Sequence, residues 1–137
     1  MIKYLTATAF CLLFPLTAVS AQNKQIFSGI YLGNSAIENP VGARIYYGPI
    51  RFKIDKKGNI AGTAFNDNTN KLLTISGKID KVSVQSGIYY VGKATGKFSD
   101  GAKWKADVSA LKGASGKALS GTCVKGKYRG SIQATKN

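Results

Sequence analysis

Apolar and polar residues alternate with a period of two through most of the chain beyond residue 24, and glycine or asparagine turns interrupt this alternation. Ile50, Phe52 and Ile54 alternate with charged residues, and residues 56–59 then turn the chain into an alternating segment at 60–65. A period of two is typical of strands with one buried face, whereas an amphipathic helix would repeat at about 3.6 residues. The sequence therefore predicts an all-β protein.

The alternating segments number about eight or nine and recur at spacings of about 8 to 14 residues, as in antiparallel sandwiches and barrels. We expect a single antiparallel meander that closes into a small up-and-down β-barrel, with a β-sandwich as the alternative. Inward positions mix glycine and alanine with single aromatic residues, which suits the taper of a small barrel. Residues 34–42 are expected to form a loop. The expected strands cover residues 25–33, 43–47, 50–54, 60–65, 73–79, 88–98, 102–110, 118–125 and 128–134.

The first 21 residues have the pattern of a secretory signal peptide. Lys3 gives a short positive region, residues 5–19 are mostly apolar, and Ala21 is the small residue after which signal peptidases cut. The apolar run of about 15 residues is shorter than the 20 or so that a membrane-spanning helix needs. We expect residues 1–21 to be cleaved, residues 22–137 to form a single basic β domain, and the protein to be periplasmic or secreted.

An exported meander of this length resembles the streptavidin and lipocalin architecture in its strand rhythm. The resemblance implies a closed antiparallel barrel. It is a likeness of fold, and it assigns no residue of this chain to a ligand site.

Side chains suited to catalysis or metal binding are scarce. The chain has no histidine, and its six acids are scattered, several of them in or beside expected turns. Cys11 would leave with the signal peptide, so Cys123 would have no partner for an intramolecular disulfide. We expect Cys123 to be a small buried strand residue. We expect neither an enzyme nor a metal or cofactor site.

Basic residues dominate the C-terminal part of the chain. The chain carries 20 basic and 6 acidic residues, and the loss of Lys3 with the signal would lower its net charge from +14 to +13. Ten basic residues but only two acids lie within residues 87–137. A surface that is merely solvated normally mixes both signs, so this imbalance favours an anion-binding face.

The expected register gathers several of these charges on one face. Residues 99–101 are expected to form a three-residue hairpin loop, which would place Lys97 opposite Lys103 and Thr95 opposite Lys105. Like charges in such positions destabilise a sheet unless something binds them. Tyr89 shares the parity of Lys97 and is a candidate for stacking on a base or a sugar. The candidate anion-binding residues are Lys93, Lys97, Lys103, Lys105, Lys125, Lys127 and Arg129.

The sequence thus predicts a non-enzymatic, exported barrel that binds an anionic surface or polymer through its basic C-terminal face. The candidate partners are lipopolysaccharide, acidic phospholipid, acidic polysaccharide and nucleic acid. Contact with a membrane would be peripheral, without a transmembrane segment, and the protein could also act as a secreted effector.

Two other functions compete with this one. In the first, a small apolar or aromatic ligand would occupy the barrel interior, as in calycin-like barrels. In the second, residues 34–42 would insert Ile37 and Val41 into a partner's cleft, as an inhibitor or immunity protein does. The interior ligand would be lined by Tyr90, Phe98, Trp104 and Tyr128.

Overall fold

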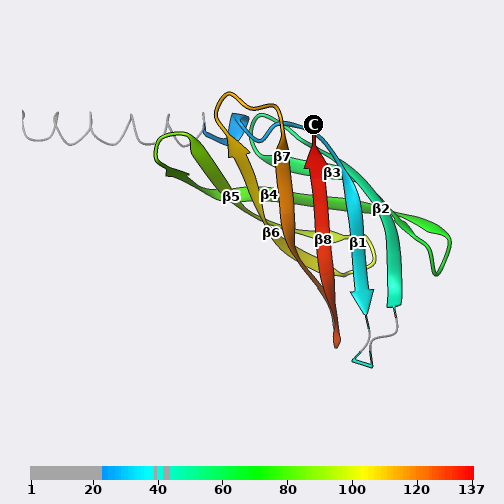
Figure 1. The fold of residues 1–137 in the computed structure, drawn as a ribbon. Coiled ribbons are helices and arrows are strands. Elements are labelled where there is room, and N and C mark those ends of the chain that lie inside the picture. The colour runs from blue at the N-terminus through cyan, green and yellow to red at the C-terminus, as the bar shows by residue number, and fades with distance from the viewer. Residues whose placement is uncertain (1–22, 39, 42–43) are drawn as a thin grey trace, which may run out of the picture.

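The structure, a computed structural model, describes residues 23–38, 40–41 and 44–137, and the expected signal peptide at residues 1–21 lies outside these ranges. The described part is a closed antiparallel barrel whose strands follow one another in chain order, with β8 paired to β1 (Figure 1). The expected up-and-down barrel is confirmed, and the sandwich is not what forms. The strands are β1 (Gly29–Glu38), β2 (Arg44–Ile54), β3 (Asn59–Asn66), β4 (Lys71–Gln85), β5 (Tyr89–Phe98), β6 (Lys103–Leu111), β7 (Lys117–Lys125) and β8 (Tyr128–Lys136).

Two expected strands, at residues 43–47 and 50–54, are one continuous strand, β2. This strand stays paired with β1 on both sides of Pro49. Pro49 has no N–H to donate, and the stretch of β2 that pairs with β3 begins only at Ile50. The proline therefore breaks no pairing with β3, and the described residues form eight strands.

The expectation that residues 34–42 form a loop is wrong for residues 34–38. These residues continue β1 and pair with β2 on one side and with β8 on the other. Ser35 and Ile37 are buried on the inward side. Polar Ser35 at an inward position hides the strand alternation in the sequence. Of the two apolar residues expected at a loop tip, only Val41 is exposed.

Aromatic side chains close one end of the barrel interior. Tyr31 of β1 and Phe52 of β2 stack with their ring centroids 5.2 Å apart. The Tyr31 hydroxyl donates a hydrogen bond to the Phe27 carbonyl oxygen at 2.7 Å, and burial raises the pKa of this hydroxyl. Phe27 is itself fully buried. The short helical turn that precedes β1 is thereby fastened across the barrel end.

Glycines make room for the single tryptophan of the core. Trp104 of β6 is buried, and its six-membered ring lies over Gly77 of β4 and Gly96 of β5, which pair with each other. A Cβ atom on Gly96 would overlap both Trp104 Cζ2 and the Ser76 carbonyl oxygen. Glycine at these inward positions lets the sheet coil tightly and lets the ring lie directly against the backbone.

Gly96→Ala should therefore destabilise the protein by roughly 2 kcal/mol or more, because both the ring and a neighbouring strand would have to shift. Gly116→Ala is the matched control, since its Cβ would meet only the Lys136 carbonyl oxygen, at 3.9 Å. The control should change stability by less than about 0.5 kcal/mol. Urea unfolding measures both changes, and equal losses would contradict the packing of Trp104 on Gly96.

Cys123 of β7 is fully buried, as the sequence predicted, and it lies opposite Trp104. Burial raises the pKa of its thiol to about 12, so the reactive thiolate is scarce at neutral pH. A thiol reagent should label the folded protein far more slowly than the urea-unfolded protein, and Cys123→Ala should cost about 1 kcal/mol. Rapid labelling of the folded protein would overturn this prediction.

Candidate anion-binding face

Four of the seven candidate anion-binding residues lie on the outer face of β5 and β6. The turn between these strands has the expected geometry, with Gly101 at φ +95°. The register that follows pairs Lys97 with Lys103 and Thr95 with Lys105, as predicted. The turn thus brings like charges together on one exposed surface. The four exposed residues are Lys93, Lys97, Lys103 and Lys105.

Two of the seven charges are paired with neighbouring acids. Lys93 Nζ lies 2.8 Å from Asp107 Oδ1, and Lys125 Nζ lies 3.1 Å from Asp100 Oδ2. The first pair is largely exposed, so it contributes little to the stability of the fold. It nevertheless removes Asp107 as a partner for the remaining lysines. The residues left without an ion pair to any described residue include Lys97, Lys103 and Lys105, called the lysine cluster below.

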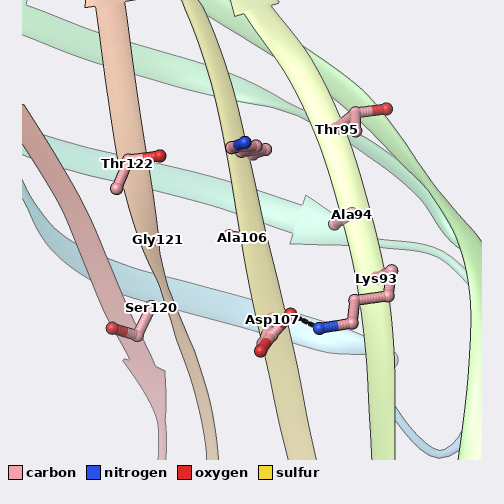
Figure 2. A pocket seen from close by; sticks show the side chains of 9 residues that line it. Lys93, Ala94, Thr95, Ala106, Asp107, Ser120, Gly121 and Thr122 are labelled. Atoms are coloured by element: carbon pink, nitrogen blue, oxygen red, sulfur yellow. Dashed lines mark hydrogen bonds and ion pairs between the residues drawn. The ribbon is translucent and has the colours of Figure 1, made fainter. Parts of the chain in front are cut away.

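A shallow depression of about 390 Å³ borders the lysine cluster on the outer face of β5, β6 and β7 (Figure 2). Figure 2 shows the hydroxyl groups of Thr95 and Thr122 on one side of it and the Lys93–Asp107 pair on the other. Because these hydroxyl side chains are short, a ligand can approach the sheet closely and exchange hydrogen bonds with them. The outward side chains that line the depression are Lys93, Thr95, Lys105, Asp107, Ser120 and Thr122.

The other three candidates lie at the β7–β8 hairpin and divide between two places. Lys127 lies in the turn, and Lys125 is directed to Asp100 in the β5–β6 turn. Arg129 instead lies in the cross-strand row of Lys97 and Lys103, with one residue of β7 between. At a strand spacing of about 4.8 Å, this row reaches from Lys97 to Arg129 over about 14 Å.

Tyr89 lies apart from the lysine cluster. It begins β5 and pairs with Leu111, whereas Lys97 lies near the other end of the strand. Eight residues of strand separate Tyr89 from Lys97, or about 26 Å. Tyr89 is therefore not placed to stack on a ligand that the lysine cluster holds.

Two lysines of β4, the strand beside β5, also lie near this face and were not among the predicted residues. Lys78 lies opposite Thr95 and Lys81 lies opposite Lys93, because a bulge makes Asp80 an extra residue between them. The sequence contains a signal of this bulge. Ile79 and Val82 both face the core at a spacing of three, which breaks the period of two.

The four residues proposed to line an interior ligand site do not share one surface. Phe98 and Trp104 are buried in the packed core, Tyr90 is half-buried, and Tyr128 is 38% exposed at the β7–β8 hairpin. Tyr128 shares the inward parity of Ile132 but lies at the rim of the barrel, outside its packed core. Trp104 Nε1 is buried without a hydrogen-bond partner among the described residues, so packing on the two glycines is what holds the ring.

No protein-family model, curated protein or solved structure matches this chain. Within the described ranges, no three side chains among His, Cys, Asp and Glu come together as metal ligands would. A search of the same residues finds no helix long and apolar enough to cross a membrane. The geometry of the basic face is thus what bears on function.

Lys97→Gln would remove one half of a like-charged cross-strand pair, so it should leave stability unchanged or raise it by a few tenths of a kcal/mol. Lys93→Gln is the comparison, because it removes the partner of Asp107 and should leave stability unchanged or lower it by up to about 1 kcal/mol. Thermal unfolding at low ionic strength measures both. A loss on Lys97→Gln as large as that of a core variant would show that this lysine has a structural role.

Proposed function

We propose that the protein is a non-enzymatic, exported β-barrel module that binds an anionic polymer through the outer face of β5–β7. The observation that carries the proposal is the lysine cluster, in which Lys97 and Lys103 are direct cross-strand neighbours and no described acid pairs with any member. Holding like charges together costs free energy in the isolated protein. A negatively charged partner would neutralise this repulsion, and its relief would contribute to the free energy of binding.

The dimensions of the face favour a partner with several charges. Lys103 and Lys105 are two residues apart on one strand, or about 7 Å, and the row from Lys97 to Arg129 spans about 14 Å. A single small anion could meet two of these charges at most. An extended polymer could meet all of them at once, and the Thr122 hydroxyl could bond to its polar groups, whereas the Thr95 hydroxyl donates to Asp80 Oδ2 at 3.3 Å.

The composition of the face favours a polymer over the interior of a membrane as the partner. The outward residues of the depression are polar or charged, and the row from Lys97 to Arg129 contains one apolar residue, the half-buried Val124. A face in which basic and polar residues predominate suits acidic polysaccharide, the phosphate-bearing saccharide of lipopolysaccharide, or nucleic acid. The export of the protein remains a prediction from residues 1–21, and it would bring the face to such polymers in the periplasm or outside the cell.

The competing functions have less support. An interior ligand would need open space in the barrel, whereas Phe98 and Trp104 are buried in the packed core and Tyr128 lies at the rim. An inhibitory loop would need a projecting apolar tip, and Ile37 is buried in β1 instead.

Binding to heparin-like polymer, lipopolysaccharide and duplex DNA at several salt concentrations tests the proposal. If about four basic residues meet the phosphates of a duplex, the logarithm of the affinity should fall with the logarithm of salt at a slope near −3.6. Salt-insensitive binding, or no binding to any of the three polymers, would contradict the proposal.

The double variant Lys97→Gln/Lys103→Gln should weaken binding by about tenfold or more, because it removes two charge contacts. Arg51→Gln/Lys53→Gln is the control of equal charge change, since β2 lies across the barrel from β6. The control should weaken binding by less than about threefold, through net charge alone. Equal losses would mean that the whole surface attracts the polymer and that the lysine cluster is not a site.

A further inference from the structure

Apolar side chains project from one end of the barrel, the end at which β4 meets β5 and β6 meets β7. Tyr89 pairs with Leu111 there, and the Lys112 N–H donates a hydrogen bond to the Ile88 carbonyl oxygen at 2.7 Å, which ties the two connections together. The β4–β5 hairpin extends past the barrel wall (Figure 1). The apolar residues and their exposed fractions are Val84 41%, Ile88 51%, Tyr89 39% and Leu111 44%.

The hairpin that carries these residues is a tight turn. Both of its central residues have positive φ, 54° at Ser86 and 71° at Gly87, and the Ile88 N–H donates a hydrogen bond to the Gln85 carbonyl oxygen at 3.2 Å. Two successive residues of this kind are typical of a type I′ turn, which matches the twist of the paired strands. Val84, Ile88 and Tyr89 are therefore held in place by this hairpin, and Leu111 lies beside them on β6.

The same end of the barrel carries many lysines and very little negative charge. The connection between β2 and β3, the start of β7 and the last residue of β8 also lie here, because the strands alternate in direction. Asp55 is the one acid at this end among the described residues, and its carboxylate accepts hydrogen bonds from the N–H groups of Lys57 at 2.8 Å and Asn59 at 2.9 Å. The lysines at this end are Lys24, Lys56, Lys57, Lys112, Lys117 and Lys136.

Two of these lysines are held beside the apolar residues. Lys117 and Lys136 are cross-strand partners on β7 and β8, and Lys117 Nζ donates a hydrogen bond to the Ser28 carbonyl oxygen at 3.0 Å. A hollow of about 320 Å³ is lined by both lysines together with Tyr89 and Leu111. Burial and the neighbouring Lys136 lower the pKa of Lys117, as expected for a positive charge without an acid beside it.

We propose that this end of the barrel, called the docking end below, binds the surface of an anionic lipid bilayer. The Val84, Ile88, Tyr89 and Leu111 side chains enter the interface, and the lysines of the same end contact acidic headgroups. Exposed apolar residues beside lysines at one end of a barrel match such a surface in both polarity and charge. A second copy of the chain is a poor occupant, because docking end to docking end would bring two sets of lysines together. The inference goes beyond the proposed function and does not rest on it.

Sedimentation of the purified protein with vesicles tests the docking end. The N terminus of the purified chain is first established by mass spectrometry, so that the presence or absence of residues 1–21 is known. The protein should bind phosphatidylcholine vesicles that contain phosphatidylglycerol and should bind pure phosphatidylcholine at least about tenfold more weakly. No binding to the anionic vesicles, or equal binding to both kinds, would overturn the proposal.

Ile88→Ser/Leu111→Ser should weaken binding to the anionic vesicles by about tenfold, because two inserted apolar side chains are lost. Val41→Ser/Leu72→Ser is the matched control, since these residues are 87% and 68% exposed and lie at the opposite end of the barrel. The control should bind as the parent does. Equal effects of the two double variants would overturn the proposal, and circular dichroism melts check that each remains folded.

A fluorescence measurement gives a second readout that does not depend on a loss of binding. Ile88→Trp should show a blue-shifted emission when anionic vesicles are added, whereas Leu72→Trp at the opposite end of the barrel should not, and buried Trp104 gives the same background in both. An unshifted emission from Ile88→Trp in the bound state would overturn the insertion of the hairpin.

Lys97→Gln/Lys103→Gln separates this inference from the proposed function. This variant should lose polymer binding and keep vesicle binding to within about threefold, because the lysine cluster lies away from the docking end. If it loses vesicle binding as well, while Ile88→Ser/Leu111→Ser keeps it, the bilayer contact is made by the β5–β7 face and the docking end is wrong.

Discussion

The pairing of β8 with β1 is the constraint on which the rest of the structure depends. It leaves neither strand with a free edge along the paired stretch, and it closes the sheet around an interior that side chains must fill. The bulk of each inward residue must then match that of its neighbours, as Trp104 over Gly77 and Gly96 illustrates. The outer surface follows from the same requirement, because the parity that turns Trp104 inward turns Lys103 and Lys105 outward.

Local patterns predict most of this barrel, because each strand buries one face, and apolar and polar residues therefore alternate along its sequence. The turn at residues 99–101 also fixes the pairing of β5 with β6, so the apposition of Lys97 and Lys103 is predictable. The strand at residues 34–38 is not predictable in this way, since its pairing with β8 joins the first strand to the last. The register of β5 with β6 also places Lys93 opposite Asp107, so their ion pair is predictable. The Lys125–Asp100 pair is not, because its residues meet from different hairpins.

The number of lysines says less about function than the positions of the acids. Asp107 is taken up by Lys93 and Asp100 by Lys125, while Asp55 is engaged in its own turn. Sequence counting treats all positive charges alike. The structure distinguishes those with a described acidic partner from those without, and the latter gather both in the lysine cluster and at the docking end.

The lysine cluster and the docking end are too far apart for the same part of a partner to contact both. β5 begins at the docking end with Tyr89 and reaches Lys97 after eight residues, about 26 Å along the strand. With the usual tilt of barrel strands, the lysine cluster would stand about 20 Å from a bilayer that the docking end contacts. This height exceeds the Debye length of about 8 Å at physiological salt, so the lipid charge would be largely screened there. A barrel standing on a membrane would therefore keep its lysine cluster free for a separate anionic partner beside it.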